Sequence, residues 1–420
     1  MTGRPASLVR HADFVRLWSA SAISAFGARI TREGLPLAAV LAMGASPAQV
    51  GLLAALSRGP ALLVGLFAGG PIDRSRKRPV LIGADIVRAV MLAALPFGAL
   101  TGRLNLIWIY VAAAVVGCAS AVFDIAHHAY LPSLIDRDRL VEGNSHLSAT
   151  DSVAEVGGPA IAGGLFQLLT APVAIFVNVL TYAASAGFLA LIRAPEPRPE
   201  AVSAPDHVLS DALEGGAIAL AHPMVRPLAL MEMTMALFGS FFSALYSLFA
   251  LRTLGLTPGL LGLTIALGGV GGLAGAVMTP RVVARFGAGP ALIGLAGAGA
   301  LFNLAIPLAP TGAWAGAGSL AVAQLFGDAL MTGAFIIAGS LRQSLLPPGA
   351  LGRVGGAISA AAGLTGVCGA LAGGWLGQFL GPRPVLLIAV LGLAAAVLAP
   401  LLSPLRGYRG DQGPIEGEVG

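Results

Sequence analysis

The sequence predicts an all-α membrane protein with about twelve transmembrane helices in two pseudo-twofold-related six-helix bundles. Three observations predict this fold class: the composition, a regular series of apolar segments, and an internal repeat. Hydrophobic residues make up 56% of the 420 residues and charged residues only 11%, whereas a soluble domain carries about 25% charged residues. So few charges cannot cover a soluble surface, and the composition therefore excludes soluble, disordered and nucleic-acid-binding proteins.

About twelve apolar segments are long enough to cross a bilayer, which takes about 20 residues of helix. The first set lies at 14–43, 49–72, 80–100, 104–131, 141–169 and 171–193. The second set lies at 226–253, 258–280, 290–309, 313–345, 350–380 and 382–404. These sets predict an N-terminal six-helix bundle over 1–193, a C-terminal six-helix bundle over 226–404 and a cytoplasmic tail over 405–420.

The segment 194–225 separates the two sets and begins with the proline-rich run Ala-Pro-Glu-Pro-Arg-Pro-Glu, which is typical of a stiff, extended spacer. Asp206 is a suitable N-cap for a short amphipathic helix that ends before Pro223. We therefore predict a cytoplasmic linker that contains one short amphipathic helix.

Glycine occurs 58 times, a number that would destabilise the helices of a soluble protein. In membranes, small residues let helices approach closely, and two glycines four positions apart are typical of such contacts. This spacing occurs at Gly65 and Gly69, at Gly271 and Gly275, and at Gly373 and Gly377. We expect each pair to pack against a neighbouring helix rather than against substrate.

The two sets of segments align with each other at an offset of 211 residues. Pro47, Arg74 and Pro79 match Pro258, Arg285 and Pro290. Parallel repeats of this kind occur in transporters built from two six-helix halves. The halves differ in charge, because Asp73 matches Ala284 and Arg58 matches Gly269. We therefore expect ion coupling and gating to be concentrated in the first half.

Basic residues set the expected orientation. With the N-terminus inside, the predicted inner segments hold 18 of the 25 lysine and arginine residues, the outer loops 3 and the spans 4. Positively charged loops stay on the cytoplasmic side of the membrane. We therefore expect a multi-pass protein of the cytoplasmic (inner) membrane with both termini in the cytoplasm.

The segment 69–78, which reads Gly-Gly-Pro-Ile-Asp-Arg-Ser-Arg-Lys-Arg, resembles the signature loop of the major facilitator superfamily, between the second and third helices. The positions that fit the pattern are Gly69, Asp73, Arg74, Lys77 and Arg78. The resemblance implies a twelve-helix transporter and a gating role for this loop. In the family, the aspartate meets the start of the eleventh helix, here near Arg353, and breaking that contact would accompany opening to the inside.

A second motif is similar to one in the family's drug/proton antiporters. Gly158, Pro159 and Gly163 on the fifth helix fit the Gly-Pro-x-x-Gly-Gly motif, although Ala162 replaces one glycine. A proline in the middle of a helix frees a carbonyl group and bends the helix. In the family this bend is typical of exporters rather than importers.

The third helix places the chain closer to one branch of these antiporters. Asp85 and Arg88 fit the macrolide-efflux and siderophore-exporter branch, and we group them with the gating motif. The sequence departs from many antiporters at Ala113, where they carry an arginine. The usual arginine-assisted proton site is therefore absent or built elsewhere.

Several charged residues lie inside predicted spans, where an ionisable group costs at least about 2.5–3.5 kcal/mol and is therefore paired, faces water or is functional. The candidates for proton coupling and for the cavity are Arg29, Arg32, Glu33, Arg58, Asp124, Asp151, Glu155, Glu232 and Asp328. The resemblance implies that the first, fourth, seventh and tenth helices line one central cavity. Asp124, Glu232 and Asp328 lie on three of them.

We hypothesise that Glu33, paired with Arg29 or Arg32, and Asp124 or Glu155 form a network that gains and loses protons during transport. The alternative is a set of static ion pairs that hold the helices together. The arginines of the first helix favour anionic substrates and the cavity carboxylates favour cations, so the charge of the substrate stays open.

These observations predict proton-coupled export of an amphipathic, drug-like small molecule by alternating access. Lys77 is followed by Arg78 and Pro79, so it lies outside any Gly-Lys-Ser/Thr sequence of an ATPase. We expect no enzymatic activity, no metal and no cofactor, and the proton gradient is the expected driving force. The expected partners are the substrate, protons and the lipid bilayer, with no nucleic acid, and the protein is expected to be monomeric. The alternatives are a siderophore or lysolipid exporter or flippase, and a non-transporting membrane sensor on the same fold.

Overall fold

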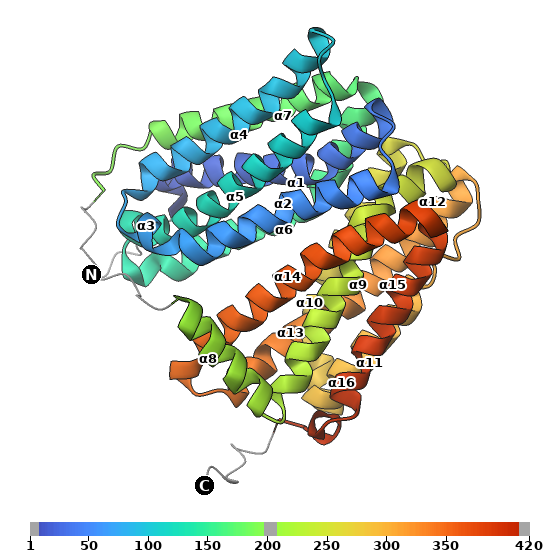
Figure 1. Cartoon of the computed structure of the whole chain (residues 1–420). Helices are drawn as coiled ribbons and strands as arrows, with labels where there is room; N and C mark the ends of the chain where they lie inside the picture. Colours follow the sequence, from blue (N-terminus) through green and yellow to red (C-terminus); the bar gives the residue numbers. More distant parts are fainter. Residues whose placement is uncertain (1–7, 197–207, 411–420) are drawn as a thin grey trace. The chain divides into compact units, whose positions relative to one another are not determined.

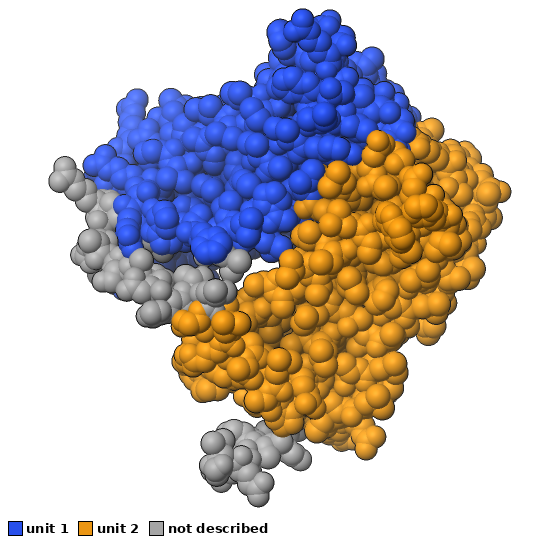
Figure 2. All heavy atoms as spheres, viewed as in Figure 1, with its two compact units in different colours: residues 1–45, 56–206 blue, residues 46–55, 207–420 orange. Residues whose placement is uncertain are grey.

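Helices account for most of the described chain (Figure 1). The computed structural model describes residues 8–196 and 208–410. The predicted linker, 194–225, and tail, 405–420, lie partly outside the described residues, as do Asp206 and the side chain of Asp73. The chain divides into two compact units, residues 1–45 with 56–206 and residues 46–55 with 207–420 (Figure 2). The bundle, linker and tail boundaries stay predictions.

Unit 1 contains α1 and most of α2, followed by four further long helices. The long helices are α1 (Ala12–Ala42), α2 (Pro47–Phe67), α4 (Lys77–Leu100), α5 (Leu106–Leu134), α6 (Leu140–Leu168) and α7 (Ala171–Ala190). The short ones are η1 (Leu8–Arg10), α3 (Gly69–Asp73) and η2 (Arg137–Arg139). The side chain of Asn105 accepts hydrogen bonds from the amides of Ile107 and Trp108 and thereby caps α5. Helix α1 packs against α6 and α7, and α4 packs against α5 and α7.

Unit 2 begins with a short helix and continues with the second series of long helices. Its helices are α8 (Val208–Ala221), α9 (Val225–Leu248), α10 (Pro258–Phe286), α11 (Ala288–Asn303), α12 (Ala313–Val322), α13 (Asp328–Leu345), α14 (Pro348–Leu380), α15 (Pro382–Ala396), α16 (Leu398–Leu401) and η5 (Pro404–Gly407). The unit also contains two π-helical turns. One, Phe249–Thr253, follows α9, and the other, Ala323–Gly327, joins α12 to α13. Helix α9 packs against α14 and α15, so the first long helix of each unit packs against the fifth and sixth.

Tight turns join two pairs of helices in unit 2. Gly287 ends α10 with a φ of 86° and Gly381 ends α14 with a φ of 84°. Residues that carry a side chain rarely adopt this left-handed backbone conformation, whereas glycine adopts it freely. Pro382 follows at the first turn of α15, where a proline's missing amide hydrogen would have no partner in any case.

Nine helices in the described part of the chain are long and apolar enough to cross a membrane, counting each π-helical turn with its flanking helices and α15 together with α16. Three further helices correspond to predicted spans: α1 and α6, which carry several charges, and α11, which has 16 residues. The predicted all-α membrane fold is confirmed by this architecture and by the comparisons reported below. The charges that make α1 and α6 less apolar are the ones that converge in the candidate site.

The predicted glycine contacts differ among the three pairs. A Cβ atom at Gly271 would overlap the carbonyl oxygen of Leu325, and one at Gly275 would overlap that of Ala329. Gly373 and Gly377 likewise lie against Phe241 and Leu245. For Gly65 and Gly69 the prediction is wrong, because a Cβ atom at either position would meet no described atom within 4 Å.

Helix α8 packs against the start of α14. Its Ala219 belongs to an apolar cluster with Leu346, Ala350, Val354 and other residues of unit 2. Glu214 of α8 forms an ion pair with Arg353 of α14 at 2.6 Å. The backbones approach so closely that a Cβ atom at Gly215 would overlap the carbonyl oxygen of Arg353.

Replacing Gly215 with alanine is expected to destabilise the contact between α8 and α14. The added methyl group has no space beside the backbone of Arg353, and overpacking typically costs about 1–3 kcal/mol. Gly216→Ala is the matched control, because a Cβ atom there meets nothing within 4 Å and alanine favours the helix by about 0.5–1 kcal/mol. Melting temperatures of the purified variants in one detergent test this, and equal values for the two variants would contradict the close contact.

The segment between α8 and α9 contains a pH-sensitive cap. The Nδ1 atom of His222 accepts hydrogen bonds from the amides of Met224 and Val225 at 3.2 and 3.3 Å. Burial lowers the pKa of His222 from 6.5, because desolvation disfavours the charged imidazolium.

The wild-type protein is therefore expected to lose a little stability as the pH falls below about 6.5, where the unfolded chain binds a proton that the folded His222 binds less readily. Because His222 is partly exposed, the loss should be about 1 kcal/mol or less. His222→Asn keeps a capping side chain without the titration. Melting temperatures from pH 7.5 to 5 should fall more steeply for the wild type, and parallel curves would refute this.

Candidate functional site

Four charged side chains of α1 and α6 form one network in unit 1. Glu155 of α6 accepts from two arginines of α1: its Oε2 lies 2.6 Å from Arg29 Nη2, and its Oε1 lies 2.7 Å from Arg32 Nη2. Arg32 also donates through Nε to Glu33 Oε1 at 3.0 Å. The i, i+3, i+4 spacing of the three α1 residues places them on one helix face, as predicted from the sequence, and the structure adds Glu155 as the shared partner.

The glycine–proline motif on α6, which is similar to the motif of drug/proton antiporters, positions this network. Gly158, Pro159 and Gly163 are all buried, and a Cβ atom at Gly158 would overlap the Cβ atom of Arg29. Glycine at this position therefore lets α6 approach α1 where Arg29 reaches Glu155. The side chains themselves stay accessible, since Arg32 and Glu155 are each 41% exposed. A network open to water can exchange protons or contact a solute.

Further charges surround this network on unit 1. Arg58 of α2 is exposed and interacts electrostatically with Arg32 and Glu33. Asp124 of α5 and Asp151 of α6 are also exposed, and both interact electrostatically with Arg29. The structure therefore brings the predicted candidates of the first half into one region of unit 1.

Asp85 and Arg88 of α4 form a different kind of site. Arg88 Nη2 lies 2.5 Å from Asp85 Oδ1, and the side chains are only 2% and 0% exposed. The Arg88 guanidinium lies between two aromatic rings, 4.3 Å from the centroid of Phe123 and 4.5 Å from that of Tyr182. Because cation–π contacts strengthen when desolvated, this pair ties α4 to α5 and α7 inside unit 1. The gating role predicted for this pair therefore does not include direct contact with the substrate.

The signature loop joins α2 to α4 through α3 and is anchored by the last two residues of its basic run. Lys77 Nζ donates to the carbonyl oxygens of Ile72 and Ser75 at 2.9 and 2.8 Å. Arg78 Nε donates to the carbonyl oxygen of Leu189, at the end of α7, at 2.9 Å. Cations at the carboxyl end of a helix also interact favourably with its dipole. Gly69 and Arg74 belong to the same loop, and Arg74 is exposed.

One anchor of this loop could not be predicted from the sequence. Glu196 accepts hydrogen bonds from the amides of Lys77 and Arg78 at the start of α4, where a carboxylate meets the positive end of the helix dipole. Arg353 forms an ion pair with Glu214 of α8, and the expected contact of Asp73 stays a prediction because its side chain lies outside the described residues. A carboxylate far away in sequence gives no local signal for such a cap.

The second half does not assemble its two predicted carboxylates at one point. Glu232 of α9 forms an ion pair with Arg342 of α13 at 2.9 Å. Asp328 lies at the start of α13, directly after the π-helical turn, where its carboxylate abuts Gly268 of α10. Residues 328 and 342 are 14 positions apart, or about 21 Å along a helix. Glu232 and Asp328 therefore belong to separate places in unit 2.

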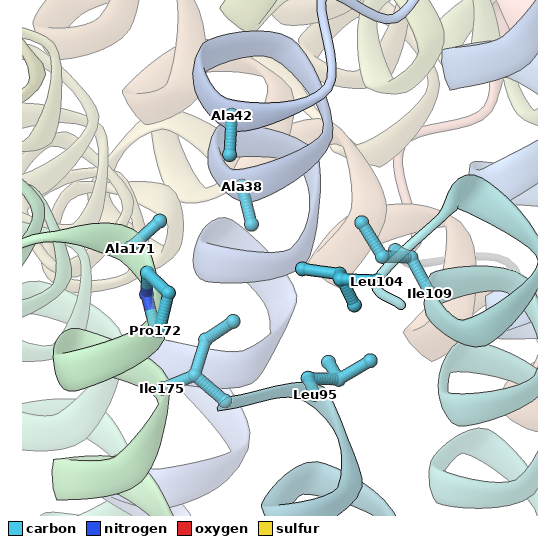
Figure 3. Close-up of a pocket in the computed structure, with 8 residues that line it drawn as sticks. All are labelled: Ala38, Ala42, Leu95, Leu104, Ile109, Ala171, Pro172 and Ile175. Atoms are coloured by element: carbon cyan, nitrogen blue, oxygen red, sulfur yellow. The ribbon is translucent and has the colours of Figure 1, made fainter. Parts of the chain in front are cut away.

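Unit 1 also contains a small apolar pocket, drawn in Figure 3. Its lining consists of Ala38, Ala42, Leu95, Leu104, Ile109, Ala171, Pro172 and Ile175. None of these side chains can form a hydrogen bond or an ion pair. A binding site needs a few polar groups to orient a ligand, so the charged network is the better candidate.

A polar chain that the sequence did not reveal lies beside the buried ion pair. Asn178 of α7 donates to Thr31 Oγ1 of α1 at 2.6 Å, and Thr31 Oγ1 lies 3.2 Å from the Tyr182 hydroxyl oxygen. Tyr182 in turn covers Arg88. Uncharged polar residues in apolar helices are common, so only their contacts reveal this link between α1 and α7.

Comparison with known proteins identifies the family. The family model described as Major Facilitator Superfamily matches residues 17–367. An uncharacterized MFS-type transporter of Bacillus subtilis, YfiS, is 25% identical over 370 residues, covering 82% of this chain and 81% of that protein.

Solved transporter structures share the fold. A bacterial homologue of the iron transporter ferroportin, in an inward-facing state, has a TM-score of 0.75 at 19% identity and covers 94% of this chain and 99% of its own. The nucleoside transporter NupG has a TM-score of 0.76 at 10% identity, with the same coverage. At these identities the likeness shows the fold alone. The family match extends over most of the described helices, and the chain therefore belongs to the major facilitator superfamily of secondary transporters.

Proposed function

We propose that this transporter exports an amphipathic, drug-like small molecule in exchange for protons by alternating access. It acts in the cytoplasmic membrane as a monomer, with both termini in the cytoplasm. Family membership makes it a transporter and not an enzyme. The substrate, the coupling to protons and the direction of transport are the proposed parts.

The observation that carries the proposal is the network of Arg29, Arg32, Glu33 and Glu155. Glu155 binds both arginines at once, so its protonation would remove the shared negative charge and weaken its contacts with two guanidinium groups. An accessible carboxylate that alternates between these two states gives a direct means of coupling proton binding to rearrangement. Charged residues within the spans of a bundle are functional candidates for this reason.

The signature loop and the buried pair support the conformational part of the cycle. Arg78 and Glu196 hold the start of α4 to the end of α7. The pair of Asp85 and Arg88 holds α4 within unit 1. We propose that unit 1 moves as one body during alternating access, while Asp73, Arg74 and Lys77 serve the gate.

Dye retention in a bacterium that lacks its own efflux pumps tests this proposal. Cells expressing the chain would be loaded with ethidium as a cation, Nile red as a neutral dye or fluorescein as an anion. We expect at least one dye to be retained less than in control cells, and a protonophore to abolish the difference. Export that persists with the protonophore would refute proton coupling. Unchanged retention of every dye, despite verified membrane expression, would refute drug-like export and favour a narrower substrate such as a siderophore or lysolipid.

A further inference from the structure

We propose that Arg58, together with Arg29 and Arg32, forms a binding site for an anionic oxygen group, a carboxylate or a phosphate, on the transported molecule. This inference rests on the proposed transport function and names the chemical class of its substrate. Four observations carry it: the ion pairs that leave Arg58 out, the position of Arg58, the unused donors, and the difference between the two halves of the chain.

The ion pairs around this site leave one arginine out. Glu155 uses one oxygen for Arg29 and the other for Arg32, and Glu33 binds Arg32. The two aspartates of this region interact electrostatically with Arg29. In the described part of the chain, no carboxylate forms an ion pair with Arg58. Arg58 is therefore the arginine that an external anion would pair with.

Arg58 lies where an uncompensated charge is costly. It is near the middle of α2, within the apolar stretch 47–65. An arginine cannot relieve the cost by losing its proton, and an ionisable group in a span pairs, faces water or serves a function. Its side chain is exposed on unit 1, which a binding site for a solute requires.

Unused hydrogen-bond donors point to the same ligand chemistry. The Nε atom of Arg29 is buried and has no hydrogen-bond partner among the described residues. The planar guanidinium fork of Arg58 matches the two oxygens of a carboxylate or phosphate. A neutral oxygen could accept these hydrogen bonds but would leave the positive charge uncompensated, and a cation would be repelled by Arg58.

The second half of the chain lacks this charge. The position that matches Arg58 in the internal repeat is Gly269. The shared helical fold therefore does not require an arginine here. An arginine that only the first half carries, beside the arginines of α1, therefore supports a ligand site in that half.

Binding of short amphiphiles to the purified wild-type protein in detergent tests the site without any gradient. The probes are octanoate, octyl phosphate, octylammonium and octanol, which share one apolar chain and differ in the head group. We expect at least one of the two anions to bind and to raise the melting temperature, and octylammonium and octanol to bind at least about tenfold more weakly. Binding of octanoate alone would identify a carboxylate site, octyl phosphate alone a phosphate site, and both together the shared anion chemistry.

Variants separate Arg58 from general charge effects. Arg58→Gln should weaken anion binding by at least about tenfold, whereas Arg58→Lys should recover part of it because the charge remains. Arg353→Gln is the control, since this arginine pairs with Glu214 within unit 2. Equal anion affinity in Arg58→Gln and wild type would overturn the inference. So would wild-type protein that binds octylammonium or octanol as tightly as either anion.

The outcomes distinguish this inference from the proposed function. Anion binding that depends on Arg58, with no dye export in cells, would refute drug-like export and leave the anion site standing. Protonophore-sensitive export of ethidium with no Arg58-dependent anion binding would leave export standing and refute the anion site.

Discussion

Glu155→Gln is expected to reduce proton-driven transport by roughly tenfold or more. Glutamine keeps the shape of the side chain but removes the charge that Arg29 and Arg32 share. Hydrogen bonds to charged groups contribute about 1.5–3 kcal/mol each, and we discount this to about 1–2 kcal/mol in total because Glu155 is 41% exposed. A change of 1.4 kcal/mol corresponds to tenfold. Initial rates of dye export, normalised to membrane expression, measure the effect.

The control for Glu155 lies on the same helix. Glu142 pairs with Arg139 at 3.1 Å, at the start of α6 and apart from the network. Glu142→Gln removes the same charge and should transport at close to the wild-type rate. If both variants transport equally well, the shared carboxylate has no role in coupling, and the alternative of static ion pairs is favoured.

Asp85→Asn is expected to destabilise the folded protein by about 3–5 kcal/mol, since removing one partner of a buried ion pair leaves the other charge uncompensated. Arg88 would stay between the rings of Phe123 and Tyr182 without its carboxylate. The double variant Asp85→Leu with Arg88→Met should recover much of the lost stability, because apolar residues of similar size often replace a buried pair without loss. Melting temperatures in one detergent measure both changes.

An exposed ion pair provides the comparison for Asp85. Arg139→Gln breaks a pair whose Glu142 side chain is 38% exposed, and such pairs contribute about 0–1 kcal/mol. Its melting temperature should stay close to that of the wild type. If Asp85→Asn melted at the same temperature as Arg139→Gln, the buried pair would not stabilise unit 1 in the way proposed here.

The fold was largely predictable because membrane spans depend on local composition. Apolar segments and proline and glycine boundaries act within one helix or one turn, and the helices begin and end close to the predicted segments. The glycine pairs show the limit of this reasoning. The same spacing gives close backbone contact at Gly271 and Gly275 and open space at Gly65 and Gly69, because contact depends on what the neighbouring helix presents.

The site was predictable only in part, for a similar reason. Helical spacing placed Arg29, Arg32 and Glu33 on one face of α1, but it could not select Glu155 as their shared partner. The family resemblance implied one cavity for Glu232 and Asp328, whereas Glu232 pairs with Arg342, which lies 14 positions from Asp328 along α13. Pairing between distant helices depends on how they pack, and the spacing of residues along one helix gives no information about that packing.

Transport by purified protein in liposomes tests the proposed proton coupling most directly. The measurement is uptake of an exported dye into vesicles with an imposed pH gradient and with none, by wild type and Glu155→Gln. We expect the wild type to accumulate the dye above its external concentration only with the gradient. A protonophore should abolish this accumulation, and Glu155→Gln should accumulate little dye. Equal accumulation without a pH gradient, or full gradient-driven accumulation by Glu155→Gln, would contradict it.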